Sequence, residues 1–167
     1  LIIKANTGDQ KHDLVGHIDP NHTALVIIDV QNDFCHPAGL LKRAGFEVSQ
    51  EQATAKKIRL MLEKARHFSV FTVFIRSVYH DEVLSKNFEE ICSRRDLPIG
   101  LCQAESWGAD WYNGIEPTDG PGEVSVTKHR FSAFLGTDFD LYLRSNNIST
   151  IIITGVNAGG STDATLR

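Results

Sequence analysis

Long apolar runs, cysteine and excess positive charge are all scarce in this sequence of 167 residues. No run is apolar and long enough to span a bilayer, which argues against a membrane protein. The net charge is -4, so neither nucleic acid nor an anionic membrane is an expected partner. The three cysteines follow no spacing typical of a metal site or a disulfide framework, so a reducing cytoplasm is the predicted location.

The composition that is present indicates one globular domain. Hydrophobic residues make up 41% and charged residues 23% of the chain, which is enough for a sizeable core. We expect residues 1–22 to form a polar, irregular arm and residues 23–167 to form the domain. The chain starts at Leu1 without a methionine and stops at Arg167, shortly after the last expected helix begins. We therefore expect the natural protein to begin earlier and to continue beyond Arg167.

Four short runs of apolar and β-branched residues predict strands. These runs are Thr23–Val30, Val70–Val78, Glu123–Thr127 and Thr150–Thr154. An amphipathic helix is expected over Ala53–Phe68. A capping-box-like start predicts a second helix over Thr137–Ser145, and Asp81–Tyr112 is expected to form a long excursion with short helices. Strands that alternate with helices predict an α/β fold, with a central parallel sheet and helices on both faces.

Reactive side chains stand at three of the predicted strand ends. Asp29 ends the first strand, Lys128 follows the third, and Ser161 opens the helix after the fourth. The carboxyl ends of parallel strands meet at one edge of a sheet, where open α/β sheets bind ligands. Asp29 could accept a proton, Lys128 could stabilise an oxyanion and Ser161 could attack. Each alone has an ordinary structural alternative, such as a helix cap at Ser161, but the three together favour a catalytic site.

Three segments resemble the motifs of one family, the isochorismatase-like cysteine hydrolases. Ala24–Phe34 resembles the family's first strand, Lys128–Asp138 its lysine motif, and Thr154–Arg167 its nucleophile loop. The motifs stand in family order, and the resemblance covers Thr23–Arg167. It implies a Rossmann-like, three-layer α/β/α fold and the hydrolysis of small amides or ureas. It also implies a homo-oligomer, either a dimer or a tetramer.

The resemblance implies a role for each site residue. Asp29 matches the catalytic aspartate, Lys128 the lysine and Ser161 the nucleophilic cysteine. The backbone N–H groups of Asn157 and Ser161 match the oxyanion hole, with a cis peptide bond expected at Val156–Asn157. A hydroxyl is far less ionised than a thiol near neutral pH. Position 161 therefore has three interpretations: a cysteine changed to serine to trap substrate, which we prefer, a natural member with other or no chemistry, or a working serine nucleophile.

The resemblance also distinguishes branches of the family. The nicotinamidase branch binds a metal through an Asp-x-His before the second strand, but Leu40–Val70 contains no aspartate. We therefore expect no metal and no other cofactor, and we interpret His80 as a loop residue. Gly39–Ser49 and Ser106–Trp111 resemble the ureidoacrylate and biuret hydrolase branch. That resemblance implies a carbamoyl or ureido amide as substrate.

Four aromatic residues are candidates for the substrate pocket, with ordinary core packing as the alternative. They are Phe34, Tyr79, Phe131 and Phe134. Two other functions also fit the sequence. One is isochorismatase activity, in which Asp29 would cleave a vinyl ether without a thiol, although isochorismatases carry Tyr and His where this chain has Asn157 and Gly159. The other is a non-catalytic family member that binds a small molecule.

Overall fold

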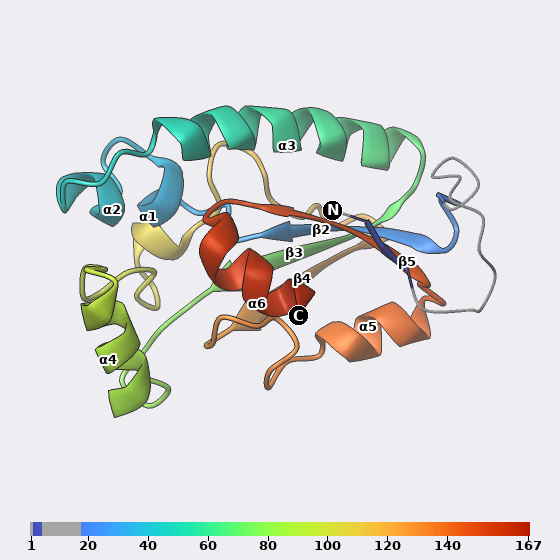
Figure 1. The fold of residues 1–167 in the computed structure, drawn as a ribbon. Coiled ribbons are helices and arrows are strands. Elements are labelled where there is room, and N and C mark those ends of the chain that lie inside the picture. The colour runs from blue at the N-terminus through green and yellow to red at the C-terminus, as the bar shows by residue number, and fades with distance from the viewer. Residues whose placement is uncertain (1, 5–17) are drawn as a thin grey trace.

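The computed structural model describes the backbone of residues 2–4 and 18–167, and side chains in the second range. One sheet contains five strands in the order β1–β5–β2–β3–β4 (Figure 1). The strands are β1 (Ile2–Lys4), β2 (Thr23–Ile28), β3 (Phe71–Ser77), β4 (Glu123–Lys128) and β5 (Thr150–Gly155). β2 pairs in parallel with both β3 and β5, and β3 pairs in parallel with β4. The prediction of four parallel neighbouring strands is therefore confirmed.

β1 departs from the irregular arm that we predicted over residues 1–22. It pairs antiparallel with β5, and Ile3 lies opposite Ile151. The exposed edge of a sheet offers unpaired backbone N–H and C=O groups, and a short strand with Ile2 and Ile3 can satisfy them. The remainder of the predicted arm includes residues 5–17, which lie outside the described residues.

β2 is buried along its whole length because helices cover both faces of the sheet. Leu25 and Ile27 belong to one apolar cluster, whereas Ala24, Val26 and Ile28 belong to a second cluster. Successive side chains of a strand point to opposite faces, so a central strand needs apolar residues at every position. This requirement explains the unbroken apolar run in the sequence.

The helices form the two outer layers. In Figure 1, α3 runs along one face of the sheet, and α5 and α6 lie on the other face. α1, α2 and α4 gather at the end toward which the arrow of β2 points. The helices are α1 (Asn32–Cys35), α2 (Leu40–Arg43), α3 (Ser49–His67), α4 (Lys86–Arg94), α5 (Phe139–Ser145) and α6 (Asp163–Leu166). The three-layer α/β/α fold is therefore confirmed.

α3 begins four residues before the predicted helix, at Ser49 instead of Ala53. Its buried face consists of Ala55, Ile58, Leu62 and Ala65, which recur at helical spacing. The first turn is polar, so a prediction based on apolar periodicity did not include it. Of the helices in the described part of the chain, none is long and apolar enough to cross a membrane.

The excursion after β3 is held to the domain by a buried carboxylate. Asp33, which is 4% exposed, accepts a hydrogen bond from the Cys102 N–H at 2.8 Å and another from the Leu40 N–H at 2.9 Å. A backbone N–H that bonds to a carboxylate makes a strong, charge-assisted hydrogen bond. Asp33 therefore joins the start of α2 to the excursion. As predicted, the excursion contains short helices, namely α4 and a single 3₁₀ turn at Trp107–Ala109.

Candidate active site

The carboxyl ends of β2, β4 and β5 present the three side chains that the sequence indicated. Asp29 follows β2 directly and has a φ of 57°, a left-handed conformation that aspartate tolerates better than most residues. Its N–H donates to Ile75 O at 2.8 Å, which continues the pairing with β3. Lys128 is the last residue of β4. Ser161 lies in a wide helical turn, Ala158–Thr162, that follows β5.

Lys128 connects these residues. Its Nζ donates to Ser161 Oγ at 2.9 Å, to Ser77 Oγ at 2.7 Å and to Asp29 Oδ2 at 3.2 Å. An ammonium has three N–H groups, so all three have an acceptor. The side chains of Lys128 and Asp29 are 0% and 2% exposed, so the ion pair between them is buried. A buried pair of this kind depends on complete hydrogen bonding, because its charges have lost the solvation of water.

Ser77 is a fourth member of this group that we did not predict. Its Oγ donates to Asp29 Oδ1 at 3.0 Å and accepts from Lys128, and Tyr79 Oη lies 3.4 Å away. Burial raises the pKa of the Tyr79 hydroxyl well above its usual value, so the phenol stays protonated and can donate. Ser77 ends β3 at the same edge of the sheet. Ser77 was therefore predictable from its place at a strand end, as Lys128 was.

Gln31 fixes the position of Ser77 through its side-chain amide. Gln31 Oε1 accepts from the Ser77 N–H and Gln31 Nε2 donates to the Ser77 carbonyl, both at 2.8 Å. The backbone pairing of β2 with β3 ends at Ile28 and Ile75. Beyond that point, the Gln31 side chain takes the place of a backbone partner for Ser77. Gln31 is 0% exposed and also donates to the Ala109 carbonyl. This contact joins the site to the excursion.

Replacing Ser77 with alanine is expected to destabilise the protein by about 1–3 kcal/mol, because Lys128 and Asp29 Oδ1 would each lose a partner in a buried site. The free energy of unfolding in urea measures this loss. Ser125→Ala is the matched control, since Ser125 is an exposed residue of β4. Equal losses in the two variants would contradict the role of Ser77 in satisfying the buried pair.

A cavity of about 1110 Å³ opens over these residues. Asp29, Ser77 and Ser161 contribute to its lining, together with apolar side chains. Three of the predicted aromatic residues also line it: Phe34, Tyr79 and Phe131. The volume is slightly above the usual range for small-molecule sites. The arrangement places polar chemistry at one side of a largely apolar space, as expected for a ligand site.

Phe134 does not belong to the lining of this cavity, in contrast to its predicted place in the pocket. Its ring is 41% exposed and its centroid lies 4.6 Å from that of Phe139, the first residue of α5. Phe139 belongs to the apolar cluster on the α5 side of the sheet. The chain turns between Phe131 and Phe134, so the first ring lines the cavity and the second packs against Phe139.

The loop after β5 differs in two ways from the prediction. Among the described residues there is no cis peptide bond, so the expectation of one at Val156–Asn157 is wrong. Asn157 instead turns the chain with a φ of 57°, and its carbonyl accepts from the Gly160 N–H at 2.9 Å. The regular helix α6 begins at Asp163 and not at Ser161. Asn157, Gly160 and Ser161 all line the cavity, which leaves the loop backbone beside the candidate nucleophile.

The three cysteines are free, and each has a raised pKa. Burial raises the pKa of Cys35 to about 12 and also raises the pKa of Cys102 and of Cys92. A cysteine attacks as the thiolate, so these thiols are poor nucleophiles at neutral pH, although Cys92 lines the cavity. Within the described ranges, no group of three His, Cys, Asp or Glu residues is placed to hold a metal ion. The expected lack of a metal stays a prediction.

The chain belongs to the isochorismatase family, because residues 23–167 match the family model described as the isochorismatase domain. Among characterised proteins it is similar to ureidoacrylate amidohydrolase RutB of Caulobacter vibrioides. The two are 26% identical over 162 residues, which cover 90% of this chain and 71% of that protein. The family resemblance seen in the sequence is therefore confirmed, and the chain belongs to a family of hydrolases.

Two solved structures show the same fold. N-carbamoylsarcosine amidase from Thermoplasma acidophilum is 26% identical with a TM-score of 0.66, over 86% of this chain and 72% of that chain. A cysteine hydrolase from Pseudomonas syringae pv. phaseolicola has a TM-score of 0.75 at 23% identity, over 90% of this chain and 66% of that chain. The present chain thus spans slightly less than two thirds of the second structure.

Proposed function

We propose that this site hydrolyses the C–N bond of a small amide or ureido compound. Residue 161 is the nucleophile, Asp29 accepts its proton, and Lys128 stabilises negative charge. The observation that carries this proposal is the position of Lys128 Nζ, 2.9 Å from Ser161 Oγ and 3.2 Å from Asp29 Oδ2. Ureidoacrylate and N-carbamoylsarcosine, which two relatives are named for, support the choice of a ureido or carbamoyl substrate.

We infer the following reaction for these groups. The nucleophile transfers its proton to Asp29 and bonds to the substrate carbonyl carbon. Negative charge develops on the carbonyl oxygen, where Lys128 and the backbone N–H groups of Asn157 and Ser161 stabilise it. The C–N bond breaks as the nitrogen takes the proton from Asp29, so ammonia or an amine leaves. Water then attacks the acyl-enzyme and releases the acid.

The serine at position 161 limits this chemistry. A carboxylate is too weak a base to ionise an alcohol, whereas a thiol beside Lys128 would be partly ionised already. We therefore infer that the chain with Ser161 binds its substrate and turns it over slowly. A cysteine changed to serine remains our preferred interpretation of this position. A cytoplasmic location and assembly as a homo-oligomer also remain predictions from the sequence.

Isochorismatase activity is the second candidate, and Ser161 is the observation that favours it. Cleavage of a vinyl ether by proton transfer from Asp29 requires no thiol. A binding protein without activity would also tolerate Ser161, since the cavity and the buried pair do not depend on sulfur.

A substrate screen separates these functions. The Ser161→Cys protein is incubated with ureido acids, N-carbamoyl amino acids, biuret and isochorismate, and ammonia release and isochorismate loss are measured. We expect ammonia from at least one ureido or carbamoyl compound and no loss of isochorismate. Loss of isochorismate alone would support the second candidate, and no turnover of any compound would support the binding protein.

A further inference from the structure

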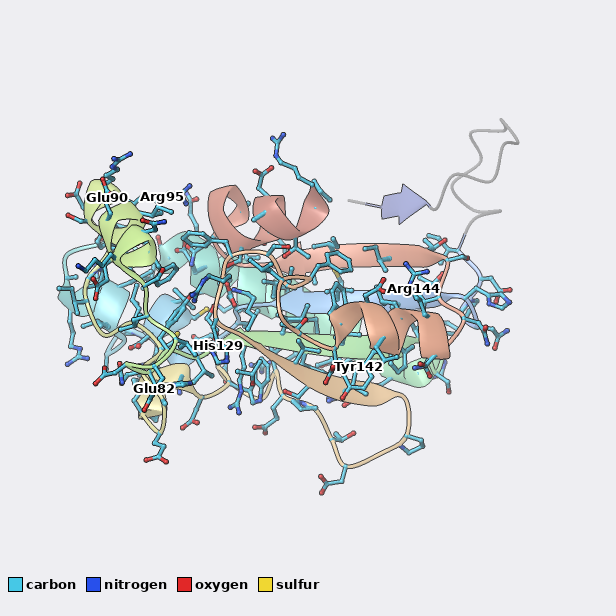
Figure 2. All side chains as sticks on the ribbon, turned by 90° about the horizontal axis from the view of Figure 1, so that it is seen from below. Glu82, Glu90, Arg95, His129, Tyr142 and Arg144 are labelled. Carbon is cyan, nitrogen blue, oxygen red and sulfur yellow. The ribbon has the colours of Figure 1, made fainter. Side chains whose placement is uncertain are left out.

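Two cationic side chains that line the cavity, Lys86 and Arg95, have no function in the reaction proposed above, and Arg95 is the one that lies beside the loop of Ser161. Arg95 follows the last residue of α4 and lines the cavity. Figure 2 labels it on the helix that stands at one end of the sheet, away from α5. A Cβ atom added at Gly160 would lie 3.9 Å from Arg95 Nη1. The guanidinium therefore reaches from α4 to the loop that carries Ser161, the next residue along the chain.

The guanidinium of Arg95 is held by an aromatic ring and not by an acid. Its Cζ lies 5.2 Å from the centroid of Phe131, which also lines the cavity. Within the described residues the guanidinium makes no hydrogen bond and no ion pair, whereas the neighbouring Arg94 pairs with Glu90. A guanidinium that packs over a ring keeps its N–H edges available, and those edges match a carboxylate in a bidentate contact.

The other charges in the cavity also favour a ligand that carries a carboxylate. Asp29 and Lys128 are ion-paired, so the inner end of the cavity carries no excess charge. The other charged residues of the lining, Lys86, Glu89, Glu90 and Asp96, are exposed, as Arg95 is, so water and salt weaken the interactions among them. None of these carboxylates lies within ion-pair distance of Arg95. A ligand carboxylate is therefore the partner that this guanidinium lacks.

We propose that Arg95 is a specificity-determining residue that binds a carboxylate of the substrate. This inference rests on the proposed function, because it places the scissile carbonyl at Ser161. The short distance from Gly160 to Arg95 means that the carboxylate stands only a few bonds from that carbonyl. The substrate class is therefore a carbamoyl or ureido acid, and a neutral compound such as biuret would leave Arg95 without a partner.

Calorimetric titration of the Ser161 chain tests this inference without turnover. The ligands are N-carbamoylglycine and N-carbamoyl-β-alanine, each compared with its neutral amide of the same size. The variants are Arg95→Gln and, as a matched control, Arg94→Gln, because Arg94 does not line the cavity. We expect Arg95→Gln to weaken binding of an acid by about ten- to a hundredfold, the range for a hydrogen bond to a charged group. Its amide should change little, and Arg94→Gln should change neither.

The outcomes separate this inference from the proposed function. If acid and amide bind but Arg95→Gln weakens neither, or weakens both equally, Arg95 does not recognise a carboxylate and the proposed function is unaffected. If no ligand binds to any variant and the Ser161→Cys protein turns over none of them, the proposed function fails and the inference fails with it. Preferential binding of the amides would also overturn the inference.

Discussion

Replacing Ser161 with cysteine is expected to raise turnover of a ureido or carbamoyl substrate by on the order of a hundredfold or more. The hydroxyl lies 2.9 Å from Lys128 Nζ, so a cysteine thiol at this position would lie beside a buried cation. A neighbouring cation favours the thiolate, which is the attacking species of cysteine. Steady-state release of ammonia from the two proteins, at saturating substrate, measures the difference.

Substrate binding should change much less than turnover in this comparison. Oxygen and sulfur differ little in reach, and neither Lys128 nor the loop backbone depends on the identity of residue 161. Ser161→Ala is the control, because it keeps the cavity and removes the attacking atom. Equal turnover by the serine and cysteine proteins would mean that residue 161 is not the nucleophile. A reaction driven by Asp29 would then become the better explanation.

Replacing Lys128 with methionine is expected to have the second large effect. The side chain is 0% exposed, and its loss would leave Asp29 as a buried carboxylate without its cation. Breaking a buried pair from one side typically costs about 3–5 kcal/mol of folding free energy. In the Ser161→Cys protein, turnover should also fall on the order of a hundred- to a thousandfold, the scale for loss of an oxyanion donor. Urea unfolding and ammonia release measure the two effects.

A second substitution separates the two consequences of losing Lys128. Asp29→Asn in the Lys128→Met protein removes the unpaired charge, so we expect it to recover part of the stability and none of the activity. Lys57→Met is the matched control, because Lys57 is an exposed residue of α3. If Lys128→Met lost no more stability than Lys57→Met, the buried pair would not hold this edge of the sheet together.

Much of the fold was predictable because local patterns decide it. A central parallel strand must be apolar on both faces, so β2 and β5 stand out as short β-branched runs. The parallel arrangement then brings the strand ends together, which is why Asp29, Lys128 and Ser161 could be grouped before any distance was known. The ion pair and the contact of Lys128 with Ser161 agree with that grouping.

Other features depend on contacts between distant segments. Ser77 bonds to Asp29 across 48 positions of the chain, and Gln31 reaches Ala109 across 78 positions. Ser77 stands at the end of β3 and could have been grouped with the other strand ends, but its bond to Asp29 depends on how the strands pair. Gln31 lies between β2 and α1 and carries no periodic signal, so its contact with Ala109 was not predictable from its neighbours in sequence. The position of Arg95 over Phe131 depends in the same way on how the excursion folds back.

Local backbone geometry was the feature that the sequence predicted least well. The turn at Asn157 uses a left-handed residue where the family resemblance implied a cis peptide bond. The start of α6 at Asp163 is a second example, since Ser161 and Thr162 both suit a helix cap. β1 is a third, because three residues are too few to show a strand pattern.

Intact-protein mass spectrometry of the Ser161→Cys protein, quenched during turnover, tests the nucleophile most directly. A covalent acyl-enzyme adds the mass of the substrate acyl group, and peptide mapping locates it. We expect an adduct on residue 161 that is absent from Ser161→Ala and is kept when Cys92, which also lines the cavity, is changed to serine. Turnover without an adduct, or an adduct on Cys92, would contradict this prediction.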